Sequence, residues 1–300
     1  MRDDIRICEL NWMEYDRRLR DDAPVVMLPV GSLEQHGPHL PMNCDALIPT
    51  SICEAVAART GGLVAPTINY GYKSQPKSGG GNHFPGTTSL DAQTLISLVR
   101  DVIKEFARHG VRKMALMDGH YENNMFLVEG IDLALRELRR DGIDDLSIAK
   151  LPYWEYASEA TLDKAFPDGF PGWPLEHAGV METSMMLHLH PELVNMDKVP
   201  MHPPADFPLH DMYPYDPATV PSSGALSAAA VATAEKGKMF MDEYVEGAAA
   251  ALVTIRQAGH EWFEHAMKTL RPRGPELRQH SDPIRQVDQQ SEEVGLLGVD

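Results

Sequence analysis

The chain has 300 residues, of which 44 are acidic and 27 basic, so its formal net charge is −17. Binding to nucleic acid or to an anionic membrane requires a basic surface, and we therefore expect neither as a partner. Apolar residues make up 43% of the chain, which is enough for the core of one large domain or two small ones.

The cysteines and the first residues indicate the compartment. Cys8, Cys44 and Cys53 form no CxxC pair, and their odd number favours reduced thiols in a cytoplasmic protein. The first twelve residues, MRDDIRICELNW, contain acids and no apolar segment, so we expect no signal peptide. No apolar run is long enough to predict a transmembrane helix.

Hydrophobic patterns predict strands and helices in alternation. Short apolar runs rich in β-branched residues are typical of buried strands, and apolar residues at helical spacing are typical of amphipathic helices. After a short strand and a helix within residues 1–22, the predicted elements are a strand at 25–30, a helix at 46–58, a strand at 63–70, a helix at 90–109, a strand at 111–117, a helix at 124–140 and a strand at 146–153. This order is typical of an α/β fold with a largely parallel sheet and helices on both faces.

Two segments without hydrophobic periodicity are predicted to be irregular. Residues 71–90 are rich in Gly, Ser and Pro, and so long a loop in a compact domain is usually functional. This loop also carries Ser78, Asn82 and His83, so we favour a function over a flexible surface linker. Residues 154–173 end in FPDGFPGW, and the pattern fits a mobile flap and a packed connector equally well.

The last part of the chain is predicted to contain two helices and a tail. One helix follows the pair Glu176-His177, and residues 199–223 form a proline-rich, irregular loop that could lie at a subunit contact. Residues 225–266 have a helical composition, and the glycines that could interrupt the helix are Gly237, Gly247 and Gly259. We expect a single domain over residues 1–270 and a polar tail over residues 271–300.

Candidate metal ligands follow the first predicted strand. Glu34, His36, His39 and Asp45 occupy the proline-containing loop after residues 25–30. Carboxylate oxygens and neutral imidazoles suit zinc, manganese and similar divalent ions. The alternative is a polar loop whose side chains face water, and this stretch alone does not decide between the two.

A second polar group favours the metal site. His120, Tyr121 and Glu122 come directly after the strand predicted at 111–117. Ligands of parallel α/β sheets bind beyond the carboxyl ends of the strands, so the two groups can meet at one edge. Five of the candidate ligands, Glu34, His36, Asp45, His120 and Glu122, already exceed what one tetrahedral ion needs, and two metals bridged by a carboxylate would use them well. Such a pair can polarise a carbonyl and generate hydroxide at neutral pH, and Glu176 or His177 could move protons.

Four separated motifs resemble the creatininase (creatinine amidohydrolase) family. They are GSLEQHGPHLPMNCD, KSGGGNHFPGTTSLD, DGHYEN and EHAGVMETS, and they occur in the family's order. The resemblance extends from about residue 8 to about residue 246, and the second motif is similar to the creatinine-hydrolysing branch of the family. It implies a three-layer α/β/α sandwich, a homo-oligomer that is usually a hexamer, and the opening of a small cyclic amide, creatinine plus water giving creatine.

The resemblance also implies a ligand set for two divalent metal ions. Glu34, Asp45 and His120 would hold one ion. His36, Asp45 and Glu122 would hold the second, so Asp45 would be the bridge between them. The ions would be zinc and manganese.

Substrate and acid–base residues follow from the same resemblance. Glu176 and His177 would be the acid–base pair, and Glu122 could also pass a proton. Trp173 would lie on a flap that closes over the substrate, while His39 would have no ligand role. The residues implied to line the substrate pocket are Ser78, Gly79, Tyr121, Trp154, Trp173 and His177.

The residue after Trp173 departs from the family pattern. It is Pro174, where the resemblance implies a carboxylate suited to the guanidine-like edge of creatinine. A related amidohydrolase acting on another cyclic amide, a ureide or a formamide is therefore an alternative. A non-catalytic metal-binding protein on the same scaffold is a second alternative, but it predicts the loss of a ligand or proton carrier, and all are present.

Overall fold

Four parallel strands form the centre of the fold in the computed structural model, which describes residues 5–258 of the chain. The strands lie in the order β2-β1-β3-β4, and their bounds are Val26–Val30 for β1, Leu63–Val64 for β2, Lys113–Asp118 for β3 and Ser147–Pro152 for β4. The register pairs Val30 of β1 with Asp118 of β3. The two central strands therefore end side by side, and the segments that follow them leave from the same edge of the sheet.

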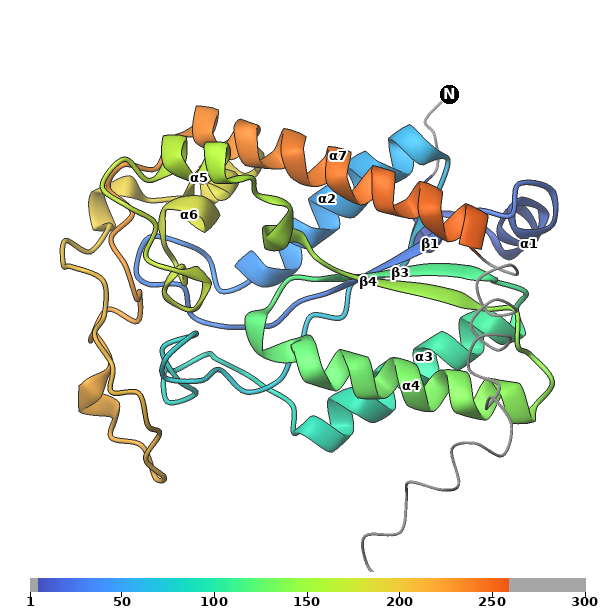
Figure 1. Cartoon of the computed structure of the whole chain (residues 1–300), viewed down its shortest axis with the longest axis horizontal. Coiled ribbons are helices and arrows are strands. Elements are labelled where there is room, and N and C mark those ends of the chain that lie inside the picture. The colour runs from blue at the N-terminus through green and yellow to red at the C-terminus, as the bar shows by residue number, and fades with distance from the viewer. Residues whose placement is uncertain (1–4, 259–300) are drawn as a thin grey trace, which may run out of the picture. The chain divides into compact units, whose positions relative to one another are not determined.

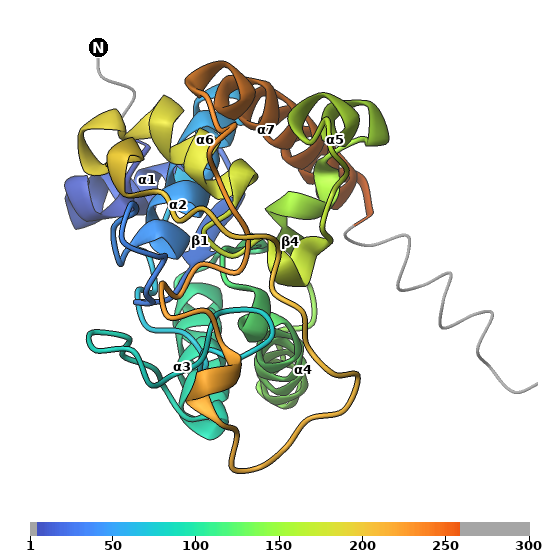
Figure 2. The same ribbon diagram turned by 90° about the vertical axis from the view of Figure 1, so that its left-hand side faces the viewer.

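Helices cover both faces of the sheet (Figure 1). On one face lie α2 (Cys44–Thr60), α6 (Val180–Leu189) and α7 (Ala234–Ala258), and on the other lie α3 (Ala92–Arg108) and α4 (Asn124–Arg140). The turned view separates the same two layers (Figure 2). The predicted three-layer α/β/α architecture with a parallel central sheet is confirmed.

Two shorter helices complete the layers. The helix α5 (Glu159–Ala165) lies beside α7, where Lys236 donates to the carbonyl oxygen of Ala165 at 2.8 Å. The helix α1 (Trp12–Asp21) is capped by Asn11, whose side chain accepts from two main-chain N–H groups of the first turn. The two helices lie at opposite ends of the molecule's long axis in this view (Figure 1).

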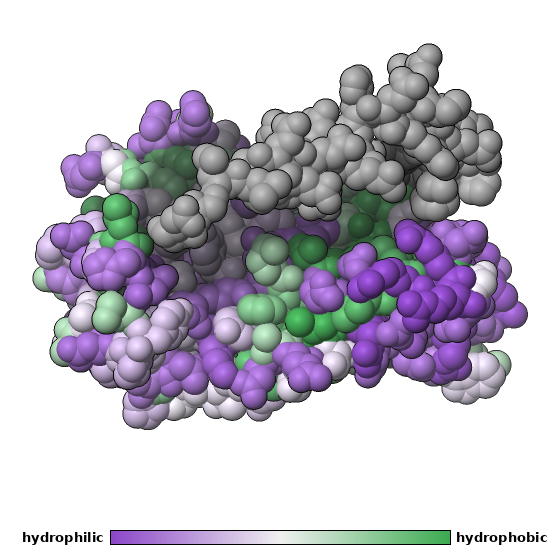
Figure 3. Space-filling model, turned by 60° about the horizontal axis from the view of Figure 1, so that its bottom comes forward, coloured by the Kyte–Doolittle hydropathy of each residue, from purple (hydrophilic) through white to green (hydrophobic). Residues whose placement is uncertain are grey.

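Burial on both faces explains the sequence of the central strand. All five residues of β1, VMLPV, are buried, which is why the strand appears in the sequence as a continuous apolar run and not as an alternating one. One core cluster joins the sheet to α2, α6 and α7, and the other joins it to α3 and α4. Figure 3 shows apolar side chains between hydrophilic regions on one face of the molecule.

Two predicted elements are shorter in the structure. The strand predicted at 63–70 is reduced to Leu63–Val64, because Pro66 has no N–H to donate to the ladder; only an isolated bridge from Val30 to Ile68 follows. The predicted first strand is likewise a single bridge from Arg6 to Val64.

The last helix begins later than predicted and is not interrupted. It starts at Ala234 and passes through Gly237 and Gly247. A Cβ at Gly237 would overlap the carbonyl oxygen of Ser184 on α6, and one at Gly247 would overlap the ring of Tyr156. These glycines permit close packing of the helix and do not break it.

Part of the sequence prediction lies outside the described residues. This applies to the helical segment beyond residue 258, to Gly259, to the domain boundary at residue 270 and to the polar tail at 271–300. Within residues 5–258, no helix combines the length and apolar character needed to cross a bilayer.

Candidate active site

Two glycines allow the strand ends to meet the start of α2. Gly31 follows β1 and Gly119 follows β3, and a Cβ on either residue would overlap the main-chain carbonyl group of Asp45. Asp45 is the second residue of α2. The loop after β1 and the turn after β3 therefore do meet at one edge of the sheet, with Asp45 between them.

Asp45 lies between two histidines that come from different strand ends. Its Oδ1 is 2.9 Å from Nε2 of His36, and its Oδ2 is 3.0 Å from Nδ1 of His120. All three residues are buried. One carboxylate facing two imidazoles is the geometry expected of a ligand that bridges two ions.

Glu34 and Glu122 flank His120. Nδ1 of His120 is 3.1 Å from Oε2 of Glu34, and its Nε2 is 3.4 Å from Oε2 of Glu122. The other oxygen of Glu122 accepts from the hydroxyl of Ser78 at 2.5 Å and from the main-chain N–H of Gln75 at 3.1 Å. Glu34, His120 and Glu122 thus form one group able to hold a metal ion.

Glu182 is a ligand-type residue that the sequence reasoning missed. Its carboxylate lies 3.7 Å from Nε2 of His36. Glu182, His36 and Asp45 form a second group of residues able to hold a metal ion. The resemblance had placed Glu122 with His36, whereas the structure groups Glu122 with Glu34 and His120. The available signal was an acid inside the largely apolar segment GVMETSMM, because a carboxylate is rarely buried without a partner. In the structure the carboxylate of Glu182 also accepts from the main-chain N–H of Ala178 at 2.6 Å.

Hydrogen bonds orient the two histidine rings. Nδ1 of His36 is 3.1 Å from the carbonyl oxygen of Glu34, and Nε2 of His120 is 3.0 Å from that of Tyr72. A carbonyl oxygen only accepts, so these nitrogens carry the hydrogens. The opposite nitrogens then present lone pairs to the carboxylate of Asp45, an arrangement that is stable only with a cation or a proton between them.

Several polar atoms in this cluster have no hydrogen-bond partner among the described residues. They are buried and comprise Oε1 of Glu34, Nε2 of His36 and Oδ2 of Asp45. A buried polar atom without a partner costs free energy, about 1–3 kcal/mol each, unless a ligand satisfies it. All three atoms are carboxylate oxygens or imidazole nitrogens that can give a lone pair to a metal ion, so the residues fit divalent metal ions.

The pKa values respond to the crowding of charges. Burial alone would lower the pKa of His36 and of His120, but the neighbouring carboxylates raise both well above the ordinary value. Burial would raise the pKa of Asp45, but the two histidines hold it well below the usual range. Burial raises the pKa of Glu34 to about 7, against the opposing effect of His120. The cluster thus attracts positive charge, whether as protons or as metal ions.

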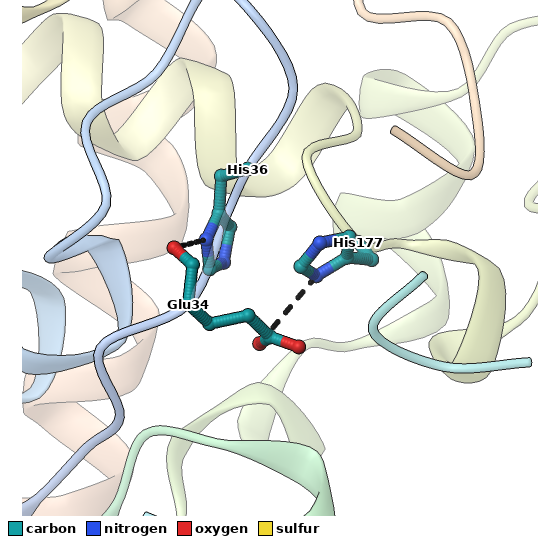
Figure 4. A group of neighbouring side chains, drawn as sticks. All are labelled: Glu34, His36 and His177. Carbon is teal, nitrogen blue, oxygen red and sulfur yellow. Dashed lines mark hydrogen bonds and ion pairs between the residues drawn. The ribbon is translucent and has the colours of Figure 1, made fainter. Parts of the chain in front are cut away.

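His177 lies beside Glu34 and His36 and forms with them a third group able to hold a metal ion (Figure 4). Its Nδ1 is 3.9 Å from Oε2 of Glu34, and the centre of its ring is 4.3 Å from that of His36. Burial, followed by the charge of His36, lowers the pKa of His177 well below its ordinary value. The imidazole is therefore neutral near pH 7.

Glu176 lies four residues before the first residue of α6, Val180. Its carboxylate accepts from the main-chain N–H of Met181, and burial raises its pKa well above the usual range. The hydrogen bond from Met181 satisfies one main-chain N–H in the first turn of α6, the turn that also carries Glu182. The acid–base role implied for Glu176 stays a prediction.

Most of the implied substrate residues line one cavity next to the cluster. Tyr121 and Trp154 have ring centres 6.0 Å apart, and Trp173 packs edge-on against Phe170 at 4.7 Å. The flap role of Trp173 stays a prediction. The implied site residues that line the cavity are Glu34, Asp45, Ser78, His120, Tyr121, Glu122, Trp154, Trp173, Glu176 and His177, joined by Gly119, Tyr153, Met181 and Glu182.

His39 and Gly79 lie outside the lining of this cavity. His39 is buried, with Nε2 3.0 Å from the hydroxyl of Thr183, so it joins the ligand loop to α6 and faces no carboxylate. Gly79 packs against the carboxylates: a Cβ there would overlap Oε1 of Glu34 and would lie 3.1 Å from Oε1 of Glu122.

The variant Gly79→Ala is therefore expected to displace the carboxylate of Glu34. We expect weaker binding of one metal ion and a loss of turnover, with little change in the fold away from this loop. Metal content by mass spectrometry and thermal unfolding would measure this. Gly130→Ala on α4 is the control, because Gly130, like Gly79, has no positive φ, and a Cβ there would crowd the side chain of Val99 and no carboxylate. Unchanged metal content in Gly79→Ala would contradict the packing argument.

The fold and the cluster define a class: an α/β protein with a buried candidate metal centre at the carboxyl ends of its central strands. The family model "Creatininase: Creatinine amidohydrolase" matches residues 8–252. A creatinine amidohydrolase of Pseudomonas putida is 56% identical over 245 residues, covering 81% of this chain and 94% of that protein. The chain belongs to the creatininase family.

Solved structures agree with this assignment. A mutant creatininase complexed with creatine superimposes with a TM-score of 0.81 at 54% identity, covering 83% of this chain and 97% of that one. A mutant creatininase of Zn-Zn type and a creatininase with Mn each give a TM-score of 0.82 at 53% and 54% identity, covering 85% of this chain and 98% and 99% of theirs.

Proposed function

We propose that this protein is a two-metal hydrolase that opens the lactam ring of creatinine to give creatine. The observation that carries the proposal is the 56% identity to a creatinine amidohydrolase over almost all of that protein, together with the carboxylate–imidazole cluster. In the reaction the lactam C–N bond breaks, the hydroxyl of water joins the carbonyl carbon, and a proton joins the ring nitrogen.

Two groups of residues would hold the metal ions. Glu34, His120 and Glu122 form one group, and His36 and Glu182 form the other. We propose that Asp45 bridges the two, since each of its oxygens faces one histidine. Zinc and manganese fit this mixture of oxygen and imidazole donors, and structures of creatininase with each metal support the choice. When bound, such a pair polarises a carbonyl and supplies hydroxide at neutral pH.

The aromatic side chains would bind and shield the flat substrate. Tyr121, Trp154 and Trp173 line the cavity, and their rings offer faces for stacking and exclude water from the site. Ser78 would contact the substrate, or position Glu122 through the hydrogen bond between them. Proton delivery to the ring nitrogen would fall to His177 or to Glu122, which both border the cavity.

The test is an assay of purified protein reconstituted with zinc or manganese. The panel should contain creatinine, other cyclic amides and ureides, and a formamide, because Pro174 supplies no carboxylate beside Trp173. Turnover of creatinine above all others is expected. Hydrolysis of another amide without creatinine turnover would refute creatinine as the substrate but would leave the assignment as an amidohydrolase intact. Metal binding without any hydrolysis would favour the non-catalytic alternative.

The cluster also predicts how stability depends on pH. Without metal, the pKa values of His36 and His120 are higher in the folded protein than in the unfolded chain, where the pKa of histidine is about 6.5. The protonated histidines therefore stabilise the fold fully below pH 6.5, and this stabilisation is lost as the pH rises through their pKa values in the folded protein. The melting temperature of the metal-free protein should therefore fall as the pH rises above about 6.5. Excess zinc should remove this fall, because the metal takes the place of the protons. Thermal unfolding in a chelator series measures both, and a flat metal-free profile would contradict the prediction.

We further propose that the protein is a homo-oligomer, with a hexamer as the expected state. The support is a run of exposed apolar side chains on the loop predicted at 199–223: Met201 is 80% exposed, Leu209 fully so, and Tyr213 78%. Apolar surface gathered on one segment is typical of an interaction site. Light scattering after gel filtration would measure the mass, and a monomer at micromolar concentration would refute the proposal.

A further inference from the structure

Gln35 makes contacts that the roles above leave unexplained. It lies between Glu34 and His36, and its side chain is buried. Its Oε1 accepts from the main-chain N–H of Gly37 at 2.9 Å. Its Nε2 has three neighbours within 3.0 Å, which are the carbonyl oxygens of Gly79 and Gly224 at 3.0 Å each and Nε2 of His177 at 2.9 Å.

This network determines which way the amide of Gln35 points. In the reversed orientation its oxygen would face the carbonyl oxygens of Gly79 and Gly224, and its NH₂ group would face the N–H of Gly37. Both arrangements are repulsive, because two acceptors or two donors would meet. The NH₂ group of Gln35 therefore faces His177.

The amide in turn determines the tautomer of the imidazole. An amide NH₂ group donates and cannot accept, so Nε2 of His177 carries no hydrogen and shares the two amide hydrogens with the carbonyl oxygens of Gly79 and Gly224. A neutral imidazole has one N–H, which must then be on Nδ1. This is the nitrogen directed toward Oε2 of Glu34 in Figure 4.

We propose that Gln35 is a positioning residue that holds His177 in its Nδ1–H tautomer and so presents an N–H donor to the cavity. The proposal rests on the proposed function, because it assigns the part that His177 plays in the same site. His177 then donates a hydrogen bond to the substrate, and Glu122 is the group that passes the proton to the leaving nitrogen.

Neutron diffraction from deuterium-exchanged crystals of the zinc-loaded protein tests this directly. We expect deuterium on Nδ1 of His177, none on Nε2, and an ND₂ group of Gln35 pointing at Nε2. Deuterium on Nε2 would overturn the proposal. The tautomer can be seen whether or not creatinine is hydrolysed, so a failure of the proposed function is distinguishable from a failure of this inference.

The variant Gln35→Met supplies a second test, since it keeps the length of the side chain and removes the donor. We expect a kcat roughly 10- to 100-fold lower, with unchanged zinc content and with deuterium no longer confined to Nδ1 of His177. Gln93→Met, an exposed site on α3, is the matched control and should keep full activity. A wild-type kcat, or an unchanged tautomer, in Gln35→Met would refute the positioning role; if this variant does not fold, the wild-type neutron structure still decides.

Discussion

Replacing Asp45 by asparagine is expected to abolish metal binding at both sites and with it the hydrolysis. Each oxygen of the Asp45 carboxylate faces one histidine, at 2.9 Å from His36 and 3.0 Å from His120. Asparagine has nearly the same shape but only one oxygen and no charge, and its NH₂ group would point at one of the two ions. Metal chemistry supplies several kcal/mol of transition-state stabilisation, so we expect turnover to fall at least ~10³-fold.

Elemental analysis and kinetics on the same sample would measure the effect. Glu54→Gln is the matched control, because it also converts an acid to an amide on α2 but concerns only the ion pair with Arg6, at 2.6 Å. That pair is partly exposed, and its loss should cost no more than about 1 kcal/mol. Two ions per chain and normal turnover in Asp45→Asn would rule out Asp45 as the bridge.

The sequence was sufficient to predict where the site lies. The strand predicted at 25–30 is a continuous apolar run, and the strand predicted at 111–117 is a mixed run that ends in MALM. Polar residues follow both strands, and parallel strands end at one edge of the sheet. This geometry brought Asp45 and His120 together without any knowledge of tertiary contacts. The resemblance added the roles, and family membership is confirmed by the match over residues 8–252.

Glu182 and Gln35 could not be found in the same way. Glu182 lies in an apolar helix whose position over the sheet depends on contacts with α2 and α7, and no local pattern encodes that position. Gln35 is one polar residue in a polar loop, and its meaning comes from three partners distant in the chain, Gly79, His177 and Gly224. The start of α7 was also not predictable from composition alone. Residues 225–233 have a helical composition but do not form part of a helix.

Replacing Glu122 by glutamine is expected to lower kcat by roughly 10²- to 10⁴-fold in a protein that remains folded. The glutamine oxygen can still accept from Ser78 and from the main-chain N–H of Gln75, so the loop should keep its place. The NH₂ group would take the position of Oε2, 3.4 Å from Nε2 of His120, and would remove a negative charge and the proton carrier together. We also expect weaker binding of the metal ion held by Glu34 and His120.

Steady-state kinetics at saturating metal would separate the two effects of Glu122→Gln. If Glu122 were only a ligand, excess zinc would restore kcat; if it also passes the proton, kcat would stay low with the site filled. Glu129→Gln, on the exposed side of α4, controls for the change from acid to amide. Because the tautomer of His177 leaves the proton transfer to Glu122, Glu122→Gln should lose more of kcat than His177→Asn does. The reverse order would return the role of proton carrier to His177, and near-normal turnover in Glu122→Gln would contradict both of its assigned roles.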